Sequence, residues 1–182
     1  MKLTNRLLTL GILVLALGAC SSGDISKTET GGVLLSITDF DGLPISISAS
    51  ASGDLAQIES LTVSNVAKDP NGTTSELMNV EIQSYEVTYT RADTGTRVPP
   101  KLVNYIFGIA PVNGTFQLDN GPFMRAEQFN TVPILDLKNL GIDSETGSRQ
   151  VRLTVGLRFF GRTLSGDRVE STTAFFTLEV TP

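Results

Sequence analysis

The chain has 182 residues, of which 40% are hydrophobic and 18% charged, which is enough for one folded domain with its own core. Its formal net charge of −5 argues against a nucleic-acid-binding role, since such proteins carry a basic surface. The chain has no histidine and only one cysteine. Histidine-dependent nucleophilic catalysis, histidine-bound metals and internal disulfides are therefore excluded, and we predict no cofactor and no metal.

The first nineteen residues have the layout of a secretory signal peptide. Lys2 and Arg6 form a charged start, residues 7–17 are apolar, and Gly18 and Ala19 supply the small residues typical of a cleavage site. The apolar run is shorter than the roughly 20 residues that cross a bilayer. We predict that residues 1–19 are removed, which leaves 163 residues with 12 basic and 19 acidic side chains.

The stretch Leu17-Gly18-Ala19-Cys20 resembles the lipobox of bacterial lipoproteins. The resemblance implies that cleavage falls between Ala19 and Cys20, and that Cys20 carries a diacylglyceryl group and an N-acyl chain. More than one chain is what stable anchoring requires. Ser21 follows where an inner-membrane retention signal would have aspartate, which implies the outer membrane of a Gram-negative host. The alternative is an unmodified cysteine after an ordinary signal.

A short polar segment separates this cysteine from the rest of the chain. Residues 20–32 contain mainly Ser, Gly, Thr and charged residues, a composition typical of a flexible tether. Fully extended, such a tether reaches up to about 40 Å. The folded domain is therefore predicted to span residues 33–182.

The first half of this domain shows strand patterns. An apolar segment over 33–40 predicts one strand, and alternation of apolar and polar residues over 45–52, 61–64 and 85–90 predicts three more. Turn signals lie at 39–42 and 69–72. Each alternating strand is expected to bury one face and to expose the other.

The middle of the chain is less regular. The apolar run over 101–107 is too short to assign, and 115–118 predicts a brief strand. Helical turns are predicted over 123–129, with Pro122 at the first helical position, and over 135–140, ending at Gly141.

The last segment is again strand-like. Alternation over 151–159 and 174–180 predicts two strands, which the turn Ser165-Gly166-Asp167 would join. We therefore predict a mainly β fold: a single antiparallel β-sandwich of immunoglobulin-like type, with one or two short helical turns in the middle of the chain.

Two acidic motifs invite a chemical interpretation. Asp93-Thr94-Gly95-Thr96 resembles the active-site tetrapeptide of aspartic proteases, but only one copy occurs and the arginines beside it, Arg91 and Arg97, predict a solvated hairpin turn. Asp39 and Asp41 could contribute oxygens to a calcium ion, although solvated turn acids are the default interpretation. No catalytic residue is predicted.

One surface is a candidate for partner binding. If Phe159 and Phe176 face the core, then Phe160 and Phe175 point outward, and Arg158 and Arg162 would give this apolar patch a basic rim. Aromatic and arginine side chains are favoured at interfaces. The alternative is that the helical turns of the middle segment cover this face.

We therefore expect a lipid-anchored protein of the cell envelope, facing either the periplasm or the cell surface. Its role would be non-catalytic, as the binder of an envelope protein or as an accessory part of an envelope assembly. The alternatives are a carboxylate-dependent hydrolase and a carbohydrate-binding module acting on envelope or extracellular polymers. The absence of tryptophan makes the carbohydrate-binding module the less favourable of the two.

Overall fold

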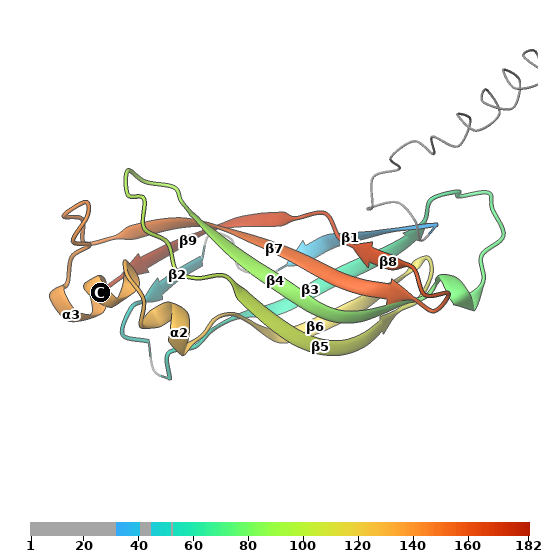
Figure 1. The fold of residues 1–182 in the computed structure, drawn as a ribbon, viewed down its shortest axis with the longest axis horizontal. Coiled ribbons are helices and arrows are strands. Elements are labelled where there is room, and N and C mark those ends of the chain that lie inside the picture. Colours follow the sequence, from blue (N-terminus) through green and yellow to red (C-terminus); the bar gives the residue numbers. More distant parts are fainter. Residues whose placement is uncertain (1–31, 41–44, 52) are drawn as a thin grey trace, which may run out of the picture.

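The computed structural model describes residues 32–40, 45–51 and 53–182 of the chain (Figure 1). Ten of the elements in this part are longer than three residues, and two are short segments of three. In chain order the elements are β1 (Val33–Phe40), β2 (Ile45–Ser48), β3 (Ala56–Ala67), η1 (Glu76–Met78), β4 (Val80–Arg91), β5 (Leu102–Ala110), β6 (Gly114–Met124), α2 (Ala126–Phe129), α3 (Ile134–Leu140), β7 (Val151–Thr163), β8 (Arg168–Glu170) and β9 (Ala174–Thr181).

The strands form two sheets, which confirms the prediction of a mainly β fold. The small sheet has the order β1-β3-β6, and the large sheet has the order β2-β9-β7-β4-β5, with β8 paired to β7. One pair departs from the expected antiparallel arrangement, because β2 lies parallel to β9. The immunoglobulin-like topology remains a prediction.

The inward rows of the two sheets make one core. Alternation places Phe159 of β7 and Tyr85 of β4 side by side in the core, with ring centroids 5.3 Å apart. Phe123 of β6 meets Phe176 of β9 edge to face at 5.5 Å, so the small and large sheets touch through aromatic rings. The predicted inward rows of β4, β7 and β9 are confirmed.

Tyrosine hydroxyls add polar links across this core. The Tyr85 hydroxyl donates to the carbonyl of Pro122 at 2.7 Å, and the Tyr89 hydroxyl donates to the carbonyl of Phe123. Burial raises the pKa of Tyr85 to about 12, and it raises the pKa of Tyr89 further. Both hydroxyls therefore stay protonated and tie β4 to the end of β6 at neutral pH.

Several predicted boundaries were wrong. The regular alternation over 45–52 forms a strand only as far as Ser48, where the Ser48 hydroxyl accepts the backbone N–H of Ser50 and the chain turns. Residues 102–107 of the unassigned run belong to a nine-residue strand, β5, and the brief strand at 115–118 extends to eleven residues as β6. Pro122 lies inside β6 rather than at the start of a helix.

The two predicted helical turns are present but do not cover a sheet face. The short helices α2 and α3 lie at one end of the elongated sandwich (Figure 1, left), where Phe129, Ile134 and Leu137 are fully buried. Gly141 ends α3 in the left-handed conformation, with a φ of 73°. Among the described residues no helix has the length and apolar character needed to cross a membrane. The predicted signal peptide and Cys20 lie outside the described residues.

Candidate functional site: a groove beside strand β8

A β-bulge in β4 lies next to the candidate site on the outer face of the large sheet. Ile82 faces Gly161 of β7, whereas Ser84 faces Phe160, so Gln83 has no partner on β7. A bulge re-aims side chains out of the regular alternation. Gln83 and Ser84 consequently both lie on the outer side of the sheet, while Ile82 and Tyr85 remain buried.

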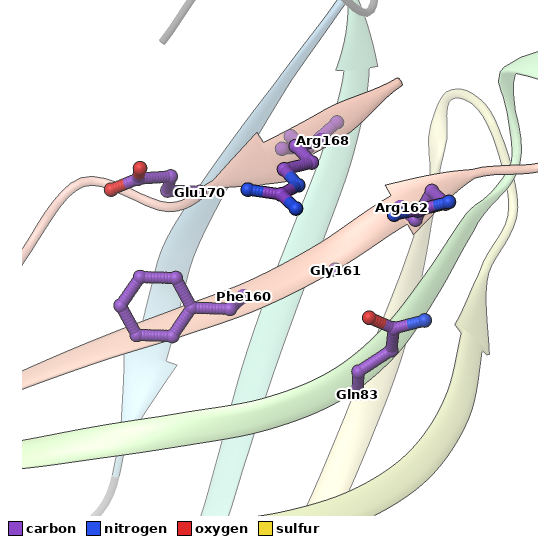
Figure 2. A pocket seen from close by; sticks show the side chains of 7 residues that line it. Gln83, Phe160, Gly161, Arg162, Arg168 and Glu170 are labelled. Atoms are coloured by element: carbon purple, nitrogen blue, oxygen red, sulfur yellow. The ribbon is translucent and has the colours of Figure 1, made fainter. Parts of the chain in front are cut away.

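A hollow of about 420 Å³ opens next to this bulge, between β8 and the strands β4 and β7. We call it the β8 groove. Figure 2 shows Arg168 of β8, Arg162 of β7 and the amide of Gln83 on β4 toward one end of the groove. The Phe160 ring lies at the other end, below Glu170. The groove therefore has a polar, basic end and an aromatic end.

The basic end holds two arginines with no side-chain partner in the described part of the chain. Arg162 and Arg168 are direct cross-strand neighbours in the β7–β8 pair, and both are exposed. Glu81 faces Arg162 on β4, but its carboxylate accepts a hydrogen bond from Gln83 at 3.4 Å and forms no ion pair with the arginine. Like charges in directly opposed positions destabilise a sheet. This end is therefore suited to a negatively charged group.

The aromatic end has its charges already paired. Arg158 donates to a Glu170 carboxylate oxygen at 3.0 Å, and its guanidinium lies 5.7 Å from the centre of the Phe160 ring. Such a contact holds the arginine against the ring face. Glu170 is thereby paired, whereas Arg162, which faces Glu81, and Arg168 form no ion pair within the described residues.

Of the predicted patch, Phe160 and Arg162 line the β8 groove, whereas Phe175 and Arg158 are outside its lining, and a single binding surface of all four remains a prediction. Phe175 is 62% exposed and lies beside Gly156, where an added Cβ would come within 2.9 Å of its ring. Gly156 is four residues from Phe160 along β7, or about 13 Å at the rise of a strand. Phe160 lines the β8 groove, whereas Phe175 lies on the same face of the sheet outside the groove lining. The helices leave both uncovered.

A second charged cluster lies at the other end of the same strand pair. Arg91, at the end of β4, is 3% exposed and donates to Asp93 at 2.6 Å and to Asp143 at 2.8 Å, the latter being fully buried. Asp93 also accepts the backbone N–H groups of Gly95 and Arg152. We call this set the Arg91 cluster. Asp93 does lie in a turn, but the prediction that Arg91 is solvated was wrong.

The electrostatics of this cluster favour ionised carboxylates. Burial acts to raise the pKa of Asp93 and of Asp143, but hydrogen bonds from Arg91 and from nearby backbone N–H groups outweigh it, so both pKa values lie below the ordinary range. Burial likewise acts to lower the pKa of Arg91, and its two carboxylate partners raise the pKa above its ordinary value. The three charges therefore bind one another and join the 92–101 loop to the 141–150 loop.

The remaining sequence-based candidates are only partly described. Asp39 lies in β1, but Asp41 falls outside the described residues, so the calcium interpretation stays a prediction. In the described ranges no group of three or more metal-ligating side chains is present. Sequence reasoning did not find Gln83 or Arg168, because a bulge and a three-residue strand leave no periodic signal.

No known protein family, curated protein or solved structure matches this chain.

Proposed function

We propose that this chain is a lipid-anchored protein of the cell envelope, and that its sandwich binds an acidic segment of a partner protein in the β8 groove without a catalytic step. The observation that carries the proposal is the pair of adjacent arginines, Arg162 and Arg168, which have no ion-pair partner among the described residues and lie at one end of a hollow of about 420 Å³. Guanidinium groups bind carboxylates through two parallel hydrogen bonds, which gives both energy and orientation.

The aromatic end of the groove supplies the second part of the recognition. Phe160 offers an apolar face next to the basic end, and its ring is held by Arg158. A partner segment that carries a carboxylate followed by an apolar side chain would match both ends. Arginine and aromatic residues together dominate the binding energy of protein interfaces.

The position of the groove also fits an anchored protein. Leu35 near the start of β1 forms a bridge with Ser171, the residue that follows β8. The chain therefore enters the sandwich close to the groove, and a tether attached at Cys20 would hold the groove toward the membrane. A partner located in or near the same membrane would be within reach.

A site-specific crosslinking experiment tests the binding site. A photo-reactive phenylalanine analogue is placed at Phe160 in living cells, and the matched control places it at Phe175, which is exposed on the same face outside the groove. We expect a defined protein adduct from Phe160 that disappears with Arg162→Glu and Arg168→Glu. The same adducts from both positions, or adducts that survive charge reversal, would contradict the proposal.

The anchor is tested separately by Cys20→Ser. We expect this variant to move from the membrane fraction to the soluble fraction, because no acyl chain can then be attached. A crosslink that is retained in the released protein would assign partner recognition to the sandwich alone. Continued membrane retention would count against lipidation.

The alternative of a carboxylate-dependent hydrolase has less support. Such enzymes keep one acid protonated by raising its pKa. Asp93 and Asp143, which share Arg91, both have lowered pKa values and use their oxygens within the cluster. On this proposal Asp93 serves stability, not bond cleavage.

A further inference from the structure

We propose that strand β5 pairs edge to edge with β5 of a second copy of this chain, forming an antiparallel dimer with one continuous sheet across the two molecules. The starting observation is the outward row of β5: Tyr105 is 83% exposed and Phe107 is 76% exposed. Val103 and Ile109 continue the same row and are also exposed. Four neighbouring apolar side chains on one strand differ from the isolated exposed residues of an ordinary surface.

The backbone of β5 is equally open. β5 is the last strand of the large sheet (Figure 1), and within the described ranges it pairs with β4 alone, so its other side is an open edge of the sheet. Its nine residues include no charged residue and no proline. Natural edge strands are normally protected by charge, proline, shortness or covering segments, and an edge without them is a template for pairing with another strand.

The other strands that end the two sheets in the described part carry such protection. β2 has only four residues. β1 has a bulge near Asp39 and is bridged at Leu35 by Ser171. The outward row of β6 is polar, and the strand contains Asp119 and Pro122. β5 has a bulge, because Ile106 and Phe107 lie opposite Gln83 alone, but it is not protected by charge, proline or shortness.

The outward row of β5 is complementary to itself. In an antiparallel pair of copies centred on Ile106, Tyr105 of one copy lies opposite Phe107 of the second, and Val103 lies opposite Ile109. Aromatic and β-branched cross-strand pairs of this kind stabilise sheets. The bulge in the β4–β5 pair places Ile106 and Phe107 of β5 opposite Gln83 of β4. The alternation of exposed and half-buried residues stays regular through it, so all four side chains lie on one face.

The charges beside β5 do not oppose this arrangement. Lys101, which precedes β5, forms an ion pair with Glu86 of β4 at 2.7 Å, so its charge is compensated within one copy. The nine residues of β5 carry no charge. Two acidic copies can therefore pair along β5 without like charges in directly opposed positions.

Cysteine pairing tests the register. Val103→Cys is made in one copy of the full chain and Ile109→Cys in an epitope-tagged second copy, and the two are mixed under mild oxidation. We expect a disulfide between the two variants but not within either variant alone, since Val103 of one copy lies about 20 Å from Val103 of the other in this register. The unsubstituted chain, whose only cysteine is Cys20, sets the baseline.

A charge placed in the seam tests the interface energetically. Sedimentation of the full chain in detergent should show a concentration-dependent dimer, and Phe107→Lys should weaken it roughly tenfold or more. Phe175→Lys is the matched control, because Phe175 is similarly exposed on another strand, and it should leave the dimer intact. A monomer at all concentrations, a dimer insensitive to Phe107→Lys, or a disulfide between two Val103→Cys copies would each overturn the proposal.

Discussion

The two ends of the β4–β7 strand pair use arginine in opposite ways. At one end Arg91 is 3% exposed and bound by two carboxylates, Asp93 and Asp143. At the other end Arg162 and Arg168 are exposed side by side and have no side-chain partner in the described part of the chain. A buried charge must be paired within the fold, whereas an exposed one remains available for a partner. The comparison separates charge that maintains the structure from charge that is free to bind.

The largest expected effect is on stability at the Arg91 cluster. Arg91→Met leaves the buried Asp143 without its cation, so we expect a loss of about 3–5 kcal/mol in the free energy of unfolding. Arg162→Met is the matched control and should change that free energy by less than about 0.5 kcal/mol. Urea denaturation of the two variants measures both values. Equal losses would remove the distinction between the two ends.

Acid should act on the same end of the molecule. The pKa values of Asp93 and Asp143 are lowered in the folded protein, so their contribution is complete above the unfolded pKa of about 4 and is lost as the pH falls through the folded values. We expect the free energy of unfolding to fall below about pH 4. The fall should be smaller in Asp143→Asn, which is less stable at neutral pH but has one fewer carboxylate to protonate. An identical pH dependence in both proteins would show that other acids dominate.

The smallest expected effect is a gain in the free energy of unfolding from a substitution in the β8 groove. Arg168→Glu places opposite charges in directly paired positions with Arg162, and we expect roughly 0.2–1 kcal/mol of added stability. The same change should abolish the partner crosslink from Phe160. A variant that is more stable and still binds would show that the two arginines are not needed for recognition. Thermal unfolding and crosslinking on one preparation give both answers.

The dimer proposed for β5 is independent of this comparison. β5 neighbours β4, whose Gln83 lines the groove, but none of the residues that line the groove belongs to β5. Phe107→Lys should therefore leave the crosslink from Phe160 unchanged. Its loss would mean that the groove acts only in the dimer.

Local pattern was sufficient to determine the fold class and the inward rows. Alternation in 85–90, 151–159 and 174–180 placed Tyr85, Phe159 and Phe176 in the core, because a strand with one buried face must repeat every two residues. The same pattern left most of β5 unassigned, because its apolar residues do not alternate with polar ones. The exposed side chains of β5 are as apolar as those of a buried strand face. Sequence composition alone does not show which face of an apolar strand is buried in the core and which is exposed at the surface.

What only the tertiary structure decided is which charges meet. Arg91 and Asp143 are 52 residues apart in sequence, and the solvated turn predicted around Asp93 is tied by Arg91 to Asp143 in a loop from another part of the chain. Arg158, Arg162 and Arg168 share one short segment, but in the described part only Arg158 forms an ion pair. The sequence gives the position of each charged residue along the chain. Which charges pair depends on distances of a few ångströms, which are fixed only when strands that are distant in the sequence pack side by side.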